Sequence, residues 1–401
     1  MSTPSELLDQ IGDIGTDHGR GGYSRHVFQP VELELREWFT AAATERGLTV
    51  SGDHNGNLWA WWGEPGPNAL VTGSHLDSVP GGGAFDGPLG VASALAAVDE
   101  LRASGFTPNR PLALVVFAEE EGGRFGVPCL GSRLLTGSID ADHARRLRDP
   151  DGVSLAEAAA YAGLDPAALG ADERLLGNLG CFIELHVEQG RGLIDQSAAV
   201  GVASSILAHG RWRFRFTGEG NHAGATLLED RKDPMLPAAR FVLAAREAAR
   251  AVPGARATVG RIVPNPGGTN VIASSADVWL DARASTAEDT RAMLAEIEAA
   301  AADAATSEGC TLNVSEESYS DTVYFDTGVR DELVRTLGDV PVLPTGAGHD
   351  AGILAARIPT GMLFVRNPTG ISHAPEEFAE RDDCTAGARA LATVLREQAG
   401  G

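Results

Sequence analysis

The chain has 401 residues, which exceeds the usual size of a single hydrophobic core, so two domains are expected. Its 55 acidic and 32 basic residues give a net charge of −23, and such a surface repels nucleic acids and anionic membranes. With 43% hydrophobic and 22% charged residues, the composition is that of an ordinary globular protein, and chemistry on small molecules is favoured.

The N-terminal sequence and the spacing of the cysteines predict the cellular compartment of the protein. The first 15 residues lack a basic region followed by an apolar segment, and no apolar run approaches membrane-spanning length. The four cysteines lie far apart, which favours reduced thiols over a disulfide framework or a paired metal site. They are Cys129, Cys181, Cys310 and Cys384. We therefore expect a cytoplasmic protein without a membrane or nucleic-acid partner.

Hydrophobic periodicity predicts helices and strands that alternate through the first half of the chain. Helical spacing covers residues 5–47 and 90–104, a hairpin covers 48–62, and apolar strands cover 69–72, 111–118 and 181–187. Continuous apolar strands are covered on both faces, so we predict an α/β/α sandwich. In such sheets the ligand lies beyond the carboxyl ends of the strands. The polar residues that follow each strand are therefore the candidates for a functional site.

The stretch 73–90, GSHLDSVPGGGAFDGPLG, follows the first of these strands. Its His75 and Asp86 are the imidazole and carboxylate that a borderline divalent metal prefers, and Asp77 could orient the imidazole. The three glycines at 81–83 permit a sharp turn between them. A phosphate cradle is disfavoured because no Gly-Lys-Ser/Thr follows and the aspartates repel anions. A surface loop with a chance histidine is the other alternative.

Two further polar clusters follow strands of their own. Glu119, Glu120 and Glu121 come directly after the strand 111–118, where adjacent carboxylates are costly unless a cation or shared proton neutralises them. His186 ends the strand 181–187. A solvated acidic turn and a structural histidine are the alternatives for each cluster alone, but three such clusters together predict a metal site.

The pattern of residues 211–321 predicts a separate domain. Strands at 211–217, 255–263, 277–284 and 310–315 alternate with helices at 233–252 and 286–307, in the order βαββαβ of a ferredoxin-like unit. The predicted domains are therefore 1–210, 211–321 and 322–401, the first and last forming one catalytic domain. Two polar clusters lie inside the block. Turn chemistry is the alternative to function for the first, 220–224, and a surface ion pair is the alternative for the second, 268–270 with 281–283.

The α/β pattern then resumes. We expect helices at 329–337 and 385–398 and a strand at 360–365, which leads into the polar segment 366–377 with His373.

Seven motifs in chain order resemble one known family. They are SHLDSVPGGGAFDG, AEEEGGRF, ELHVEQG, NHAG, DAR, GAGHDA and GISHAPEE. The set is similar to the N-carbamoyl-L-amino-acid hydrolase and allantoate amidohydrolase family, within the superfamily of dinuclear-metal aminoacylases and carboxypeptidases. The resemblance implies a two-domain protomer that forms a homodimer through the inserted domain, which serves as a lid.

The resemblance also implies roles for single residues. One divalent ion is held by His75, Asp86 and His186, and the other by Asp86, Glu121 and His373, with Asp86 as the bridge. Zn, Mn, Co and Ni all suit these ligands. Glu120 becomes the general base, which takes a proton from the attacking water and returns it to the leaving nitrogen; a carboxylate that only supports the ligands is the alternative.

The resemblance also implies which residues bind the substrate, a small molecule with a carboxylate. The resemblance implies that His222 acts in the site of a partner subunit and stabilises the oxyanion. It implies that Arg283 grips the α-carboxylate through its planar fork. The other residues assigned to substrate binding are Gln189, Asn270, Gly370 and Ser372.

The sequence departs from the family pattern in three places: Thr226-Leu227-Leu228, Ala273-Ser274 and Val365-Arg366-Asn367-Pro368. We hypothesise that Arg366 faces the cleft and recognises a second anionic group, such as the side chain of an acidic N-acyl amino acid. A solvated surface arginine is the competing interpretation.

The favoured function is removal of a carbamoyl or similar small acyl group from an L-amino acid, the L preference being inherited from the resemblance. Allantoate hydrolysis and hydrolysis of N-formyl or N-formimidoyl acidic amino acids are alternatives. His186 argues against a dipeptidase or long-chain acylase. A metal-binding but non-catalytic protein, and an amidase that uses Ser74 or Cys129 as nucleophile, are alternatives from other classes.

Overall fold

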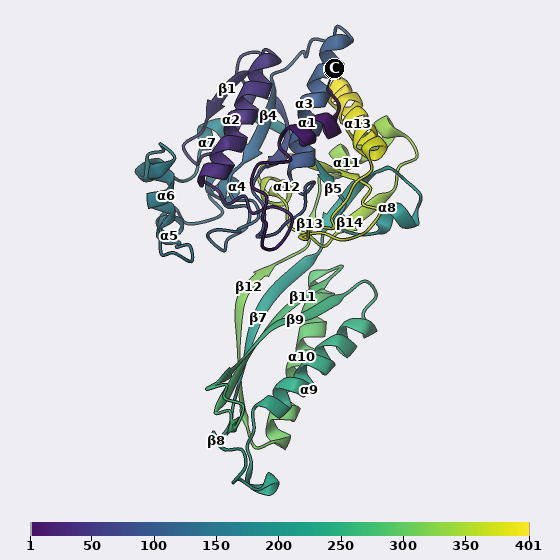
Figure 1. The fold of residues 1–401 in the computed structure, drawn as a ribbon. Helices are drawn as coiled ribbons and strands as arrows, with labels where there is room; N and C mark the ends of the chain where they lie inside the picture. The colour runs from purple at the N-terminus through teal and green to yellow at the C-terminus, as the bar shows by residue number, and fades with distance from the viewer. Residues whose placement is uncertain (1, 401) are drawn as a thin grey trace. The chain divides into compact units, whose positions relative to one another are not determined.

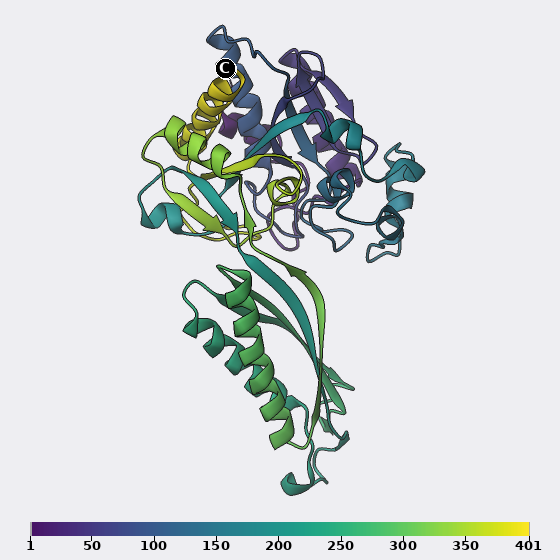
Figure 2. The same ribbon diagram turned by 180° about the vertical axis from the view of Figure 1, so that it is seen from behind.

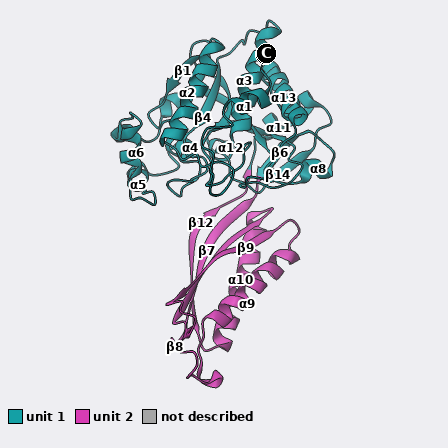
Figure 3. Ribbon diagram, viewed as in Figure 1, with its two compact units in different colours: residues 1–205, 324–401 teal, residues 206–323 magenta. Residues whose placement is uncertain are grey.

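The computed structural model describes residues 2–400, and the chain divides into two compact units (Figure 3). The larger unit contains the residues up to Ser205 and those from Tyr324 onward, and the smaller unit runs from Ile206 to Val323. The smaller unit is thus flanked in sequence by two parts of the larger one. The predicted boundaries, 210/211 and 321/322, differ from these by a few residues.

A nine-stranded mixed sheet forms the centre of the larger unit, in the order β1-β2-β4-β3-β5-β15-β6-β13, with β14 paired to β6. The middle strands β4, β3, β5 and β15 are parallel neighbours, and β2 and β6 join them antiparallel. All residues of β3, β4 and β15 are buried, as their apolar sequences require. The strands are β1 (Thr49–Gly52), β2 (Leu58–Trp62), β3 (Ala69–His75), β4 (Leu112–Phe117), β5 (Leu179–Val187), β6 (Val200–Ile206), β13 (Val323–Tyr324), β14 (Val342–Thr345) and β15 (Thr360–Val365).

Helices cover both faces of this sheet (Figure 1). One core packs the sheet against α1 (Pro4–Gln10), α2 (Pro30–Glu45), α3 (Pro88–Ala103), α11 (Thr327–Leu337) and α13 (Arg381–Gly400). Because side chains alternate along a strand, Ile183 and Leu185 of β5 enter this core, whereas Glu184 and His186 point to the opposite face. On that opposite face α12 (Asp350–Leu354) packs against β5 and α4 (Leu130–Thr136). This mixed α/β architecture is of the predicted class.

Several short elements had no sequence prediction. Beyond α4, α12, β6 and β14, they are α5 (Ala141–Arg146), α6 (Leu155–Tyr161), α7 (Glu173–Leu176), α8 (Gly192–Asp195) and the 3₁₀ turns Pro166–Ala168 and Leu228–Asp230. Caps define them locally: Ser154 and Glu157 form a capping box at α6. Within residues 2–400, no helix is long and apolar enough to span a bilayer.

The smaller unit has the strand and helix order βαββαβ. Its four-stranded antiparallel sheet runs β12-β7-β11-β9, and α9 and α10 lie side by side on one face (Figures 1 and 2). Phe214 and Phe216 of the sheet pack against Phe241 of α9. The elements are β7 (Ala208–Thr217), β8 (Asn221–His222), α9 (Met235–Ala251), β9 (Arg256–Asn265), β10 (Val271–Ile272), β11 (Ser275–Ala284), α10 (Ala287–Ser307) and β12 (Thr311–Ser320). This order is that of a ferredoxin-like unit, and its role in closure or dimerisation stays a prediction.

Candidate metal centre

Each of the four parallel strands of the larger unit leads into a polar donor residue at the same edge of the sheet. His75 ends β3, Glu120 and Glu121 follow β4, and His186 lies next to the end of β5. His373 lies in the segment after β15. Because the carboxyl ends of parallel strands meet at one edge, residues distant in sequence converge there.

Asp86, between β3 and α3, lies at the centre of this convergence. Its Oδ1 is 3.1 Å from Nε2 of His186 and 3.5 Å from Nε2 of His75. Its Oδ2 is 3.4 Å from Nε2 of His373, which lies 3.3 Å from Oε2 of Glu121. Two donor groups result, His75/Asp86/His186 and Asp86/Glu121/His373, and each uses a different oxygen of Asp86. These are the two sets of three that the family resemblance implies.

The two buried histidines present the nitrogen that a metal needs. Nδ1 of His75 lies 3.1 Å from the backbone oxygen of Asp77, and Nδ1 of His186 lies 2.9 Å from that of Val187. A carbonyl only accepts, so both Nδ1 atoms carry hydrogen and direct Nε2 toward Asp86. Both Nε2 atoms are buried without a hydrogen-bond partner. Imidazole and carboxylate donors in this arrangement fit Zn, Mn, Co or Ni.

The charges of the cluster favour a bound cation. Burial raises the pKa of Glu121 to about 8, and the neighbouring charge of Asp86 adds to the shift. Burial likewise raises the pKa of Glu120 well above its usual value. Burial opposes the charged form of His75, but Glu120, Asp77 and Asp86 outweigh it and raise the pKa of that imidazole. The carboxylates therefore attract positive charge, which a divalent ion supplies more fully than a proton.

Asp77 supports both sides of the cluster. Its backbone oxygen accepts the hydrogen bond from His75, whereas its side-chain Oδ1 is 3.6 Å from Nδ1 of that ring. The carboxylate accepts instead from the backbone N–H groups of Glu120 and Glu121, at 3.2 and 3.1 Å. The predicted orientation of the imidazole thus comes from the main chain of Asp77, and its side chain fixes the turn after β4.

Glu120 stands beside the donor groups and belongs to neither. Its Oε2 is 3.6 Å from Nε2 of His75, and its Oε1 lies 3.4 Å from Sγ of Cys129. Glu119 and Cys129 beside it, and His373 of the second donor group, adopt left-handed backbone angles with φ of 54°, 55° and 57°. Such strain in residues other than glycine is concentrated at functional sites.

Gln189, Gly370 and Ser372, predicted to bind substrate, lie at the same edge. Nε2 of Gln189 is 2.8 Å from Oδ2 of Asp86 and 3.1 Å from Oγ of Ser372. Ser372 in turn lies 3.1 Å from Oδ2 of Asp86. Gly370 has a φ of 67°, and a Cβ there would lie 2.5 Å from Arg191, which explains the glycine.

The smaller unit carries His222, Asn270 and Arg283, whose roles toward a substrate stay predictions. Nδ1 of His222 accepts hydrogen bonds from the backbone N–H groups of Gly224 and Ala225, both at 3.1 Å, so Nε2 carries the hydrogen and is a donor. Pairing of β8 with β10 places His222 opposite Val271, next to Asn270. The guanidinium of Arg283 donates two hydrogen bonds to Asp281, at 2.7 and 3.0 Å.

Arg366 differs from the solvated arginine of the competing interpretation. Its Nε and Nη2 each lie 2.8 Å from a carboxylate oxygen of Asp383, whose side chain is 4% exposed. Recognition of a second anionic group by Arg366 stays a prediction, and this bidentate ion pair competes with it.

The sequence reading gave no role to four buried residues near the centre: Glu184, His349, Asp350 and Glu377. Glu184, His186 and His349 form a third donor group, but Glu184 already accepts from Ser74 Oγ at 2.8 Å and Ala351 N at 3.0 Å. All four lie in the motifs ELHVEQG, GAGHDA and GISHAPEE, so the signal was present without an assignable chemistry.

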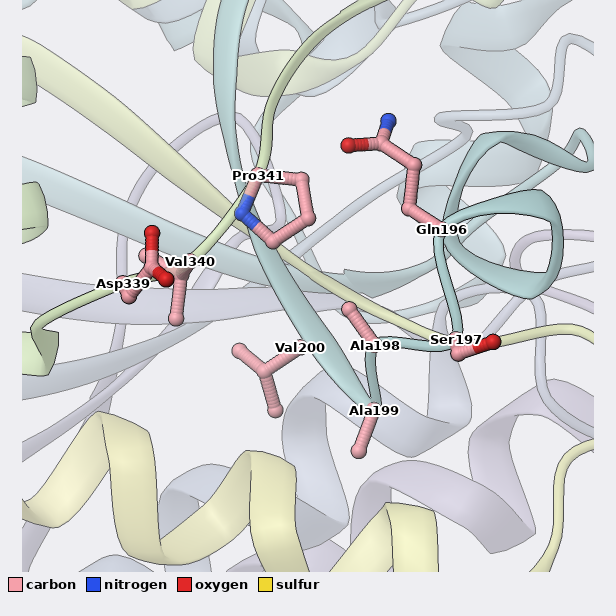
Figure 4. Close-up of a pocket in the computed structure, with 8 residues that line it drawn as sticks. All are labelled: Gln196, Ser197, Ala198, Ala199, Val200, Asp339, Val340 and Pro341. Carbon is pink, nitrogen blue, oxygen red and sulfur yellow. The ribbon is translucent and has the colours of Figure 1, made fainter.

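A pocket of about 530 Å³ lies elsewhere in the larger unit (Figure 4). It is lined by residues 196–200 and 339–341, among them Gln196, Asp339 and Pro341. None of the donor residues lines it, so it is separate from the metal centre.

Comparisons with known proteins identify the family of the chain. The model of Peptidase family M20/M25/M40 matches residues 71–397. An N-carbamoyl-L-amino acid amidohydrolase of Geobacillus stearothermophilus is 36% identical, covering 96% of this chain and 95% of its own. An allantoate amidohydrolase of Escherichia coli is 30% identical, covering 98% and 97%. The solved structure of a hydantoinase/carbamoylase-family amidase from Burkholderia multivorans superposes with a TM-score of 0.86 at 30% identity, covering 99% and 98%.

The resemblance inferred from the seven motifs is therefore confirmed. The chain belongs to Peptidase family M20/M25/M40, as a hydrolase of carbon–nitrogen bonds similar to the amidohydrolases of that family.

Proposed function

We propose that the protein removes an N-carbamoyl or similar small N-acyl group from an L-amino acid. The observation that carries this proposal is the position of Asp86, which offers one oxygen to each donor group while Glu120 stands beside them. The similarity to carbamoyl-amino-acid amidohydrolases supports the substrate class. Membership of the family establishes that the protein is a hydrolase. The identity of the acyl group and the preference for the L enantiomer are what we propose.

The residues of the chain divide the reaction between them. Two divalent ions held by the donor groups would activate water near neutral pH and polarise the scissile carbonyl. Glu120 accepts the proton of the attacking water and transfers it to the substrate nitrogen as the carbon–nitrogen bond breaks. The products are the free amino acid and carbamic acid, so one water is consumed and no redox partner is needed.

The smaller unit supplies the remaining groups in this proposal. His222 donates from Nε2 to the oxygen that becomes negative, and Arg283 and Asn270 bind the α-carboxylate. His222 acts in the site of a partner subunit, so the active form is a homodimer through the smaller unit. The support is the donor tautomer of His222, set by two backbone N–H groups on its Nδ1.

Allantoate is the second candidate substrate, because it also presents a carboxylate beside ureido nitrogens and because an allantoate amidohydrolase is among the relatives. Acidic N-formyl or N-formimidoyl amino acids are third, and they depend on Arg366. A non-catalytic role is disfavoured because the sequence retains every predicted donor and Glu120.

A substrate panel tests these choices. Purified protein is stripped with chelator and reloaded separately with Zn, Mn, Co and Ni, then given N-carbamoyl, N-formyl and N-formimidoyl amino acids, L and D, and allantoate. We expect no turnover after stripping and the highest kcat/KM with an N-carbamoyl-L-amino acid after reloading. Activity that survives complete removal of metal would contradict the proposal and favour an amidase that uses Ser74 or Cys129.

A further inference from the structure

Glu377 connects the two loops that carry Asp86 and His373. Its Oε1 accepts hydrogen bonds from the backbone N–H groups of Phe85 at 3.1 Å and Asp86 at 2.9 Å. Its Oε2 accepts from Oγ of Ser372 at 3.0 Å. Glu377 is only 4% exposed, so these bonds form in a site largely shielded from water.

The close fit around this carboxylate shows that its position is specific. A Cβ at Gly83 would lie 2.4 Å from Oε1 and 2.5 Å from Cβ of Glu377, so a residue with a side chain at position 83 would displace it. Phe85 and Phe378 also pack edge to face with ring centroids 6.0 Å apart. The loop before α3 and the segment after β15 are therefore held together at Glu377.

The two donor groups depend on this connection to different degrees. His75 and His186 lie within β3 and β5, and strand pairing places them opposite Phe117 and Phe364. His373 has no strand around it, its side chain is 49% exposed, and its backbone is in the left-handed region. The 3.4 Å separation between His373 Nε2 and Asp86 Oδ2 thus relies on the contacts that join the two loops.

We propose that Glu377 is a positioning residue for the second donor group, Asp86/Glu121/His373. The first group, His75/Asp86/His186, depends on it less, because strand pairing fixes both of its histidines. Ser372 is the intermediate, because its hydroxyl lies 3.0 Å from Glu377 and 3.1 Å from Oδ2 of Asp86. The inference rests on the two-ion site of the proposed function. Glu377 acts through the loops and does not touch substrate.

The test measures metal binding to the whole protein. Glu377→Ala, Glu377→Gln and the neighbouring exposed control Glu376→Ala are stripped, titrated with Co²⁺ and followed by calorimetry, absorption of the bound ion and elemental analysis. For wild type and Glu376→Ala we expect about two ions per chain. For Glu377→Ala we expect one binding step to be retained and the other to weaken by about tenfold or more.

Glu377→Gln separates charge from geometry and keeps the test informative if the alanine variant does not fold. Its amide oxygen still accepts from the backbone, but its NH₂ meets Ser372 as a donor, so we expect a smaller, selective weakening of the same step. Two unchanged binding steps in either folded variant, or equal weakening of both, would overturn the role of Glu377. A wild type that binds fewer than two ions would instead contradict the two-ion site itself.

Discussion

Nε2 of His186 lies 3.1 Å from Oδ1 of Asp86. Because Nδ1 of the same ring is bound to the backbone oxygen of Val187, the nitrogen that faces Asp86 is the one with the lone pair. Positive charge between the lone pair and the carboxylate oxygen would stabilise this arrangement. The pairing is therefore a candidate position for the first cation, and the other residues of the candidate centre lie around it.

Replacement of Glu120 by Gln tests the general base. The amide cannot accept a proton, and we expect kcat to fall by about 10²- to 10⁴-fold. Bound metal should stay at the wild-type level, because Glu120 belongs to neither donor group. The measurements are kcat and metal content of the same preparation. Loss of metal in parallel with activity would show that Glu120 is a ligand.

Cys129 provides a second test of the base. Its thiol lies 3.4 Å from Oε1 of Glu120, and burial raises the pKa of the thiol well above its usual value, which disfavours a thiolate nucleophile. We expect Cys129→Ala to lower kcat about fivefold, the effect of one hydrogen bond worth about 1 kcal/mol, with little change in KM. Cys129→Ser should restore most of it. Complete inactivation of the serine variant would point to a covalent role for sulfur.

Gly87 makes room for His75. A Cβ at this position would lie 2.4 Å from Cε1 of the ring, and φ is 85°. We expect Gly87→Ala to weaken metal binding as well as stability. The control is Gly105→Ala, where φ is 74° and nothing lies within 4 Å of the added carbon, so only backbone strain of about 1–3 kcal/mol is expected. Equal metal affinity in both variants would contradict the steric role.

Arg366 pairs with the buried carboxylate of Asp383, and its loss leaves that charge unpaired. We expect Arg366→Ala to lower the free energy of unfolding by about 2–4 kcal/mol, and Arg366→Ala with Asp383→Asn to recover part of it. Denaturant unfolding measures both. The same variants, compared on acidic and neutral substrates, test recognition of a second anion: equal losses on both would remove that role.

Acid should reveal the contribution of Asp277. Hydrogen bonds from Arg213 and Arg215 lower the pKa of this carboxyl below its ordinary value of 3.8, despite opposing desolvation. A depressed pKa stabilises the fold above pH 3.8, and the contribution is lost as pH falls through the folded-state value. We expect Asp277→Asn to lower the thermal midpoint at pH 7. The difference in midpoint from wild type should shrink as the pH falls below 3.8. A difference that stays constant down to pH 3 would contradict this assignment.

The amino-acid sequence by itself determined the class of fold and, through motifs that resemble a known family, the residues predicted to form the metal centre. His75, Glu121 and His186 each end or follow a continuous apolar run, and an apolar run of that length is a local property that survives any change in the rest of the chain. Parallel strand ends converge by topology, so the runs predicted that these three donors lie near one another. The full ligand set, with Asp86 shared and Glu121 chosen over Glu120, is what the family resemblance implied. The short helices between 130 and 176 were missed because helices of four to seven residues derive their stability from packing and not from propensity.

Only the tertiary structure decided which atoms meet. Asp77 supports the histidine through its backbone and the glutamates through its carboxylate, Arg366 turns to Asp383, and Glu377 reaches Asp86 across 291 positions of sequence. Each of these choices depends on a side-chain rotamer and on the path of a loop. No periodicity encodes them, because they are selected by the packing and the hydrogen-bond requirements of groups that become neighbours only after folding.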